Sequence, residues 1–265
     1  MLKIFILSCW RSGTSWLEDI LGKKVEGSTL FGHEQQILPL LSMYKQCFGK
    51  TSSEIKRQAN KPLCDINKSE FHHQLGLKQH KILSNADKWT KEDFKSFGLR
   101  FIDFLLKPYE EKYKQVVEKS PENGSPEVFN CAIELLSDIK DIKLIYLVRK
   151  FKPYLASCFT KFIKNEKNDI DYYTTRWLEW NENAIQQIER IHPTNLFILS
   201  YEDLVSDPTV VEKFSVVRKK DIKIRPHTLN KWKDSPIIEE INKYYIENIN
   251  RIKRIEKFVE NNKIA

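Results

Sequence analysis

Apolar residues are grouped along the chain in short runs that alternate with stretches of helical spacing. The runs predict strands, because they are long enough to cross a sheet and too short to span a membrane. They are Leu2–Leu7, Gln115–Glu118, Lys143–Val148 and Leu196–Leu199, with one more short strand ending near Phe31. Strands that alternate with helices and carry polar residues at their carboxyl ends are typical of a doubly wound parallel sheet. The sequence therefore predicts an α/β, P-loop-like fold of three layers, with residues 1–265 forming one domain.

The predicted helices lie between and after these strands. They cover Trp16–Leu21, Phe94–Leu105, Ser125–Ser137, a segment opened by Pro153, Tyr172–Ile191, Pro208–Phe214 and a final helix from Ser235 to Val259. Phe94, Phe97, Phe101 and Phe104 recur at helical spacing, so we expect them in the core, and Pro108 is expected to end their helix. Residues 36–90 are polar, contain Pro and Gly, and are expected to be irregular.

The first predicted strand leads directly into a turn, Ser8 to Ser15, that is rich in hydroxyl side chains and contains Gly13. A strand, a glycine-containing turn and a helix direct backbone N–H groups and the helix dipole toward one point, where they can bind an anion. Arg11 adds a positive charge to the same turn. The alternative is an ordinary turn in which Gly13 only permits an unusual backbone angle.

The composition agrees with an anionic ligand. Among 265 residues, 44 are Lys or Arg and 36 are Asp or Glu, which gives a formal net charge of +8. The lysines are scattered, so nucleic acid is not an expected partner. Five separated cysteines without a CxxC pair argue against disulfides and against a zinc site, and favour a reducing compartment. With no signal peptide before the first strand and no membrane span, we expect a cytoplasmic protein. No cluster of metal ligands stands out in the sequence, so we expect no metal.

The turn differs from the P-loop of nucleoside triphosphate enzymes, G-x-x-x-x-G-K-[ST]. Ser8 replaces the first glycine, and Thr14 replaces the lysine that reaches the β- and γ-phosphates. The strand Lys143–Val148 ends in Arg149 and not in a magnesium-binding acid. A nucleotide kinase or other P-loop phosphotransferase is therefore disfavoured and stays an alternative, as does a non-catalytic nucleotide-binding protein with a degenerate site.

Two segments together resemble the sulfotransferases that use 3′-phosphoadenosine 5′-phosphosulfate (PAPS). The run from Trp10 to Trp16, W-R-S-G-T-S-W, resembles their loop for the 5′-phosphosulfate. Leu147-Val148-Arg149, with Ser157 eight residues later, resembles their motif for the 3′-phosphate. The resemblance implies PAPS as co-substrate and an in-line, metal-independent transfer of its sulfuryl group to a hydroxyl or amine acceptor.

The resemblance extends over nearly the whole chain. Glu118-Lys119-Ser120-Pro121 is similar to the E-K-[ST]-P element of carbohydrate and tyrosylprotein sulfotransferases, Phe197–Pro208 to their Y-E-D-L…D-P segment, and Leu229–Trp232 to their C-terminal end. Gly32-His33-Glu34 is similar to the stretch that supplies their catalytic acid.

One branch of the family fits less well. The cytosolic small-molecule branch has Lys in place of Arg11, and its R-K-G triplet lacks the glycine here, at Arg218-Lys219-Lys220. The chain therefore resembles the carbohydrate, tyrosylprotein and bacterial branch more closely.

The resemblance assigns roles to individual residues. The 5′-phosphosulfate would be held by Arg11, Ser12, Gly13, Thr14, Ser15 and Trp16, and the 3′-phosphate by Arg149 and Ser157. Tyr201 would line the adenine pocket or fill the core. Glu34 would take the proton of the acceptor, with His33 as the rival base, while Lys119 and Arg11 would stabilise the transferring group.

These roles have structural alternatives. Arg149 could be a structural cation at the end of a strand, and Lys119 a surface charge. Trp177, Trp180 and Trp232 are expected to pack in the interior.

The acceptor has no motif of its own in the sequence. The basic composition favours an acidic or carbohydrate acceptor over a lipophilic phenol, and residues 36–110 are predicted to form its pocket or a lid. The final helix is expected to dock on the domain; an arm that protrudes into a homodimer is the alternative.

Overall fold

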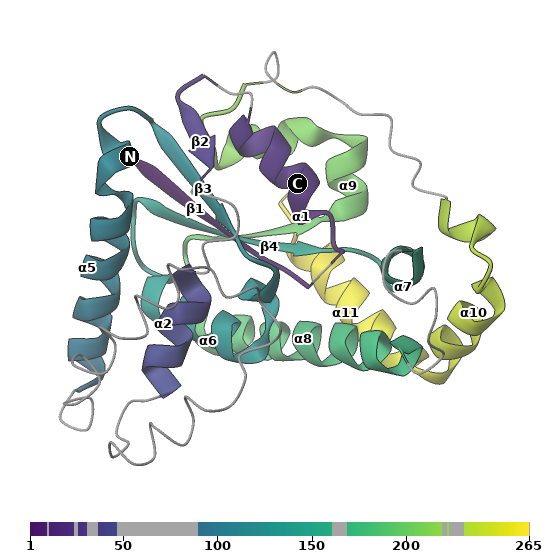
Figure 1. Ribbon diagram of the computed structural model, residues 1–265. Helices are drawn as coiled ribbons and strands as arrows, with labels where there is room; N and C mark the ends of the chain where they lie inside the picture. The colour runs from purple at the N-terminus through teal and green to yellow at the C-terminus, as the bar shows by residue number, and fades with distance from the viewer. Residues whose placement is uncertain are drawn as a thin grey trace.

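The computed structural model describes residues 1–9, 11–23, 26–30, 37–46, 90–160, 169–218, 222 and 231–264. Within them, five parallel strands form one sheet in the order β2-β3-β1-β4-β5. The strands are β1 (Leu2–Leu7), β2 (Ser28–Leu30), β3 (Gln115–Lys119), β4 (Ile142–Val148) and β5 (Leu196–Ser200). Helices cover both faces of the sheet (Figure 1). The prediction of an α/β fold with a central parallel sheet is confirmed.

The central strand is apolar on both sides. Successive side chains of a strand point to opposite faces, so Phe5 and Leu7 enter the larger of two core clusters while Ile4 and Ile6 enter the smaller. β1 pairs with β3 on one edge and with β4 on the other. A strand that is covered on both faces and paired on both edges needs a continuous apolar run, which the sequence of β1 provides.

The helices form two layers. On the face of the larger cluster lie α2 (Ile37–Gln46), α5 (Lys91–Glu110), α6 (Pro126–Leu136), α7 (Phe151–Cys158), α8 (Asp169–Ile191), α10 (Ile238–Glu247) and α11 (Ile249–Asn262). On the other face lie α1 (Thr14–Glu18), the π-helix η1 (Asp19–Lys23), α9 (Tyr201–Ser206) and the 3₁₀-helix η5 (Pro208–Lys213). Two short 3₁₀-helices, η3 (Pro121–Gly124) and η7 (Lys231–Asp234), complete the described elements. None of these helices is both long and apolar enough to cross a membrane.

The prediction that residues 36–90 are irregular is wrong for α2. This helix buries Ile37, Leu38 and Leu41 in the larger cluster. Pro39 does not prevent the helix from forming. It lies in the first turn, where backbone N–H groups have no acceptor within the helix, so the missing N–H of proline costs no hydrogen bond.

The prediction for α5 also needs correction. The helix continues through Pro108 to Glu110, since a proline in the last turn removes only one hydrogen bond of the ladder. Its buried stripe is Phe94, Gly98, Ile102 and Leu106. Phe104 is 74% exposed, and Phe97 and Phe101 stack on each other at partial burial. Phe94 is thus in the core and Phe97 and Phe101 pack against it, while Phe104 is not, so the aromatic spacing indicated the helix correctly and its buried face only in part.

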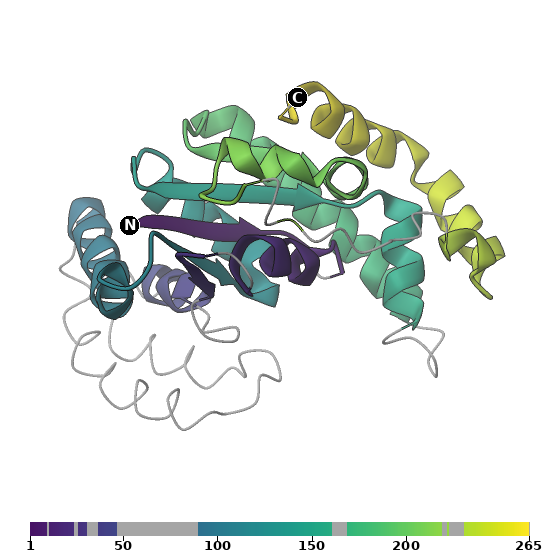
Figure 2. The same ribbon diagram turned by 90° about the horizontal axis from the view of Figure 1, so that it is seen from above.

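The final helix docks on the domain, as expected, but it is two helices. α10 ends at Glu247 and α11 begins at Ile249, with the break at Asn248. Ile241, Ile252 and Ile255 are buried in the larger cluster. Figure 2 shows α10 and α11 on the side of β5, at the end of the molecule away from α5.

Three predicted helix starts differ in detail. α7 begins at Phe151, two residues before Pro153. Ser125 is the N-cap residue of α6, but its side chain makes no capping hydrogen bond. The segment after Asp207 is a 3₁₀-helix, and its cap forms as expected, since an Asp207 oxygen accepts from the Thr209 N–H at 3.0 Å.

Candidate functional site

The turn after β1 is held in an unusual backbone conformation. Arg11 has φ 61° and Gly13 has φ 95°, both in the left-handed region. A residue with a Cβ in that region costs about 1 kcal/mol or more, and such residues cluster at functional sites. The carbonyl of Gly13 accepts from the N–H groups of Trp16 and Leu17 at 3.0 and 3.1 Å, which starts α1.

Gly13 is needed for space as well as for its backbone angle. A Cβ at this position would lie 2.2 Å from Cδ2 of Tyr201. Tyr201 is 5% exposed and meets Trp16 edge to face, with ring centroids 6.0 Å apart. Tyr201 therefore lies directly against the turn, although the two are far apart in the sequence.

Two arginines converge beside this tyrosine. Nη1 of Arg149 donates to the carbonyl oxygen of Arg11 at 3.1 Å, and the Arg149 guanidinium lies over the Tyr201 ring, 4.6 Å from its centroid. Nε of Arg11 donates to Oγ of Ser157 at 3.1 Å. Within the described part of the chain, Ser157 therefore has a hydrogen bond to Arg11 and none to Arg149, the arginine of its own motif. The residues after β1, β4 and β5 meet at the carboxyl edge of the sheet, where proteins of this architecture bind ligands.

The charge of Arg149 is only partly compensated. Burial lowers the pKa of its guanidinium, and the nearby charge of Arg11 lowers it further, while Tyr201 and Glu202 act in the opposite direction. Arginine nevertheless stays protonated in proteins. Its Nε is buried and has no hydrogen-bond partner among the described residues. Two guanidinium groups and an unused N–H suit an anion with more than one charge.

Lys119, at the carboxyl end of β3, is 8% exposed. It lies in register with Ile6, near the end of β1. The alternative that Lys119 is an ordinary surface charge is therefore excluded.

A buried polar network lies next to Lys119. The two carboxylate oxygens of Glu118 accept from Oγ of Ser120 at 2.7 Å and from Nδ2 of Asn123 at 2.8 Å. The same Asn123 amide donates to the carbonyl of Ile6 at 3.1 Å. Burial raises the pKa of Glu118 to about 7, while these hydrogen bonds and the charge of Lys119 act in the opposite direction.

The short helix η3 packs directly on the start of the β1–α1 turn. A Cβ on Gly124 would lie 2.3 Å from the carbonyl carbon of Ser8, so only glycine fits there. The hydroxyl of Ser8 donates to the carbonyl of Leu147 at 2.6 Å, which ties the turn to β4. The segment Glu118–Gly124 thus fixes the turn from the β3 side. This role was not predicted; its signal in the sequence is an Asn and a Gly shortly after the end of a strand.

α8 ties two parts of the site together. Nη2 of Arg176 lies 3.1 Å from an oxygen of Glu122 in η3, in a partly buried ion pair, and the Arg176 guanidinium lies 4.1 Å from the centroid of the Trp180 ring. The neighbouring Trp177 is fully buried, and its indole N–H donates to the carbonyl of Arg149 at 3.1 Å. Both tryptophans pack in the interior, as expected. The ion pair was not predicted, because its partners are 54 residues apart.

For the remaining predicted site residues the structure gives only a degree of burial, or they lie outside the described part of the chain. Ser12 is buried, Thr14 is half-buried and Ser15 is exposed, all at the start of α1. Trp10, His33 and Glu34 lie outside the described residues. Within the described part of the chain, no group of three or more His, Cys, Asp or Glu side chains is placed to hold a metal ion.

A parallel sheet with a glycine turn and two arginines after neighbouring strands defines a P-loop-like α/β protein, with an edge whose charges suit an anion. The chain belongs to the sulfotransferase family, whose model matches residues 3–211. It is therefore a sulfotransferase, and the resemblance found in its sequence is confirmed at the level of the family.

Two solved structures share the fold. The sulfotransferase domain of the curacin biosynthetic pathway is 19% identical, with a TM-score of 0.54, over 97% of this chain and 96% of that one. The sulfotransferase domain of the Synechococcus olefin synthase is also 19% identical, with a TM-score of 0.52, over 87% and 86%. At this identity the likeness shows the fold alone. Comparison with curated protein sequences gives no match.

Proposed function

We propose that this sulfotransferase takes its sulfuryl group from PAPS and transfers it to a hydroxyl or amine acceptor. The observation that carries the proposal is the convergence of Arg11, Arg149 and Ser157 beside Tyr201 at one edge of the sheet. PAPS carries a phosphate at each end of its ribose, so its site needs two cationic groups close together and a surface for adenine. Two arginines and an adjacent aromatic ring meet that need.

In this proposal the two arginines have different tasks. Arg149 binds the 3′-phosphate as a fork-shaped donor, using the Nε that has no partner among the described residues. Arg11, Thr14, Ser15 and the backbone N–H groups of the turn hold the 5′-phosphosulfate. Tyr201 lines the adenine pocket.

The transfer itself needs a proton acceptor and stabilisation of negative charge. Lys119, buried at the end of β3, is assigned to the transferring sulfuryl group, together with Arg11. Glu34 is assigned as the base that takes the proton of the acceptor, with His33 as its rival. A well-placed base contributes roughly 10²–10⁴-fold to the rate.

The donor assignment is tested by calorimetric titration with 3′-phosphoadenosine 5′-phosphate (PAP), with AMP and ATP as controls. We expect PAP to bind at least about tenfold more tightly than AMP, because a charged phosphate–arginine contact is worth about 1.5–3 kcal/mol. Arg149→Ala should remove most of this preference. Equal affinity for PAP and AMP in the wild-type protein would refute the proposal, and a preference for ATP with Mg²⁺ would favour the phosphotransferase alternative.

Catalysis is tested separately with labelled PAPS. Pools of glycans, tyrosyl peptides and small alcohols serve as acceptors, and the net charge of +8 leads us to expect transfer to an acidic or carbohydrate acceptor. Glu34→Gln should keep the affinity for PAP and lower turnover. Unchanged turnover would transfer the role of base to His33, and binding of PAP without transfer to any pool would indicate a non-catalytic protein.

A further inference from the structure

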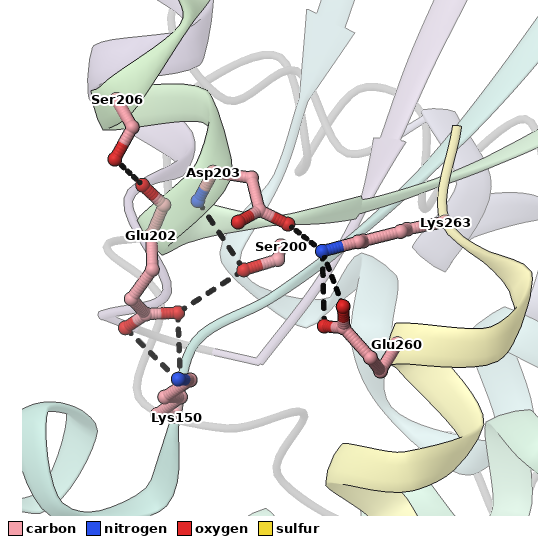
Figure 3. Close-up of polar contacts among 7 residues, drawn as sticks. All are labelled: Lys150, Ser200, Glu202, Asp203, Ser206, Glu260 and Lys263. Atoms are coloured by element: carbon pink, nitrogen blue, oxygen red, sulfur yellow. Dashed lines mark hydrogen bonds and ion pairs between the residues drawn. The ribbon is translucent and has the colours of Figure 1, made fainter. Parts of the chain in front are cut away.

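An acidic residue on α9 reaches the corner between β4 and α7. Figure 3 shows Glu202 with its carboxylate directed at the backbone of Lys150. The Lys150 N–H donates to both carboxylate oxygens, at 3.3 and 3.4 Å, and Oγ of Ser200 donates to one of them at 3.3 Å. Lys150 is the N-cap residue of α7 and directly follows Arg149. Glu202 therefore fixes the backbone next to the arginine of the anion site.

The charge of Glu202 also bears on this arginine. Burial raises the pKa of Glu202, and the Lys150 N–H and the charge of Arg149 lower it. No ion pair between Glu202 and Arg149 is found in the described part of the chain, although both side chains lie in it. The carboxylate thus balances part of the positive charge of Arg149, while the guanidinium lies over the ring of Tyr201.

α9 is attached to the molecule by contacts that do not involve Glu202. Lys263 forms an ion pair with Asp203 at 2.7 Å and another with Glu260 (Figure 3). The N–H of Ile264 donates to the carbonyl of Ile198 in β5 at 3.1 Å. Tyr201 and Leu204 of α9 are also buried in the smaller cluster. α9 therefore has attachments that do not involve Glu202, and substituting this residue tests its effect on the β4–α7 corner.

We propose that Glu202 is a positioning residue for the nucleotide site, and that its contact with the Lys150 N–H holds Arg149 in place to bind the 3′-phosphate. The inference rests on the proposed function in one respect, the binding of that phosphate by Arg149. Tyr201 and Glu202 are neighbours on α9. This short helix therefore supplies both the ring under the Arg149 guanidinium and the carboxylate that binds the Lys150 N–H next to Arg149.

Calorimetry with PAP and AMP tests this role, using Glu202→Ala, Arg149→Ala and the double variant. Glu202→Ala should weaken PAP binding about tenfold, as expected for the loss of one hydrogen bond to a charged group, and should leave AMP binding within about twofold. In the Arg149→Ala background the same change should have less than about a twofold effect on PAP. Glu202→Gln keeps an acceptor oxygen and should restore most of the affinity.

Hydrogen exchange of the Lys150 amide gives a readout that needs no nucleotide. It should be faster in Glu202→Ala than in wild type and unchanged in Glu240→Gln, a carboxyl-to-amide change at an exposed position of α10. Equal losses of PAP and AMP affinity, additive effects with Arg149→Ala, or unchanged exchange at Lys150 would each overturn the inference. A wild-type protein that does not distinguish PAP from AMP would instead refute the proposed function, whatever the exchange data show.

Discussion

Replacing Glu118 by glutamine should remove a pH dependence from the stability of the folded protein. The Glu118 side chain is 2% exposed, and burial raises its pKa from 4.5 to about 7. Below pH 4.5 the carboxyl is protonated in the folded and the unfolded chain and has no effect. Between pH 4.5 and 7 it ionises only in the unfolded chain, so the free energy of unfolding falls as pH rises. Above pH 7 the folded protein carries the buried charge, and the loss is complete.

The size of this loss follows from the pKa. A difference between 4.5 and about 7 corresponds to about 3 kcal/mol, at about 1.4 kcal/mol for each pH unit. Glutamine has nearly the same shape, can accept from Asn123 through its oxygen, and can donate to the Ser120 oxygen through its amide. We therefore expect Glu118→Gln to differ from wild type by less than about 1 kcal/mol at pH 5 and to be about 3 kcal/mol more stable at pH 8.

Urea unfolding followed by circular dichroism at pH 5, 6, 7 and 8 measures this difference. The midpoint of thermal unfolding should differ by about 5 °C at pH 8 for a chain of this length. Glu240→Gln, an exposed carboxyl change, serves as the control for other titrating groups. A difference between Glu118→Gln and wild type that stays constant from pH 5 to pH 8 would refute the reasoning.

Two further substitutions test other contacts of the site. Gly13→Ala places a Cβ against the Tyr201 ring, at a positive φ that residues with a Cβ rarely adopt. We therefore expect the free energy of unfolding to fall by about 1–3 kcal/mol and PAP to bind more weakly in calorimetry. If both values are unchanged, the Tyr201 ring moves freely and the reasoning is refuted. Arg176→Met removes one partner of the partly buried ion pair with Glu122 and should cost up to about 3 kcal/mol in urea unfolding at pH 7. Adding Glu122→Gln should recover most of that loss, and a double variant as unstable as Arg176→Met would show that the pairing is not its cause.

The sequence alone determined the sheet and the side of it that carries the site. β1 and β4 are apolar runs of the kind that a parallel strand covered on both faces needs. Arg149 directly follows β4, and Arg11 lies in the turn after β1. In a parallel sheet the carboxyl ends of all strands lie at one edge, so the sequence places both arginines at that edge. That β1 and β4 are neighbours is given by the strand order of the sheet. Family membership could be predicted for the same reason, because its motifs are local.

Only the tertiary structure decided how these residues contact one another. Ser157 binds Arg11, and Tyr201 occupies the space that a side chain at position 13 would need. In the same way, local spacing indicated α5 but only part of its buried face, because the neighbouring helices determine which side is covered. A contact between residues far apart in the chain leaves no periodic signal, since it depends on how whole elements pack. The sequence therefore predicted which groups reach the edge of the sheet, and packing determined their partners.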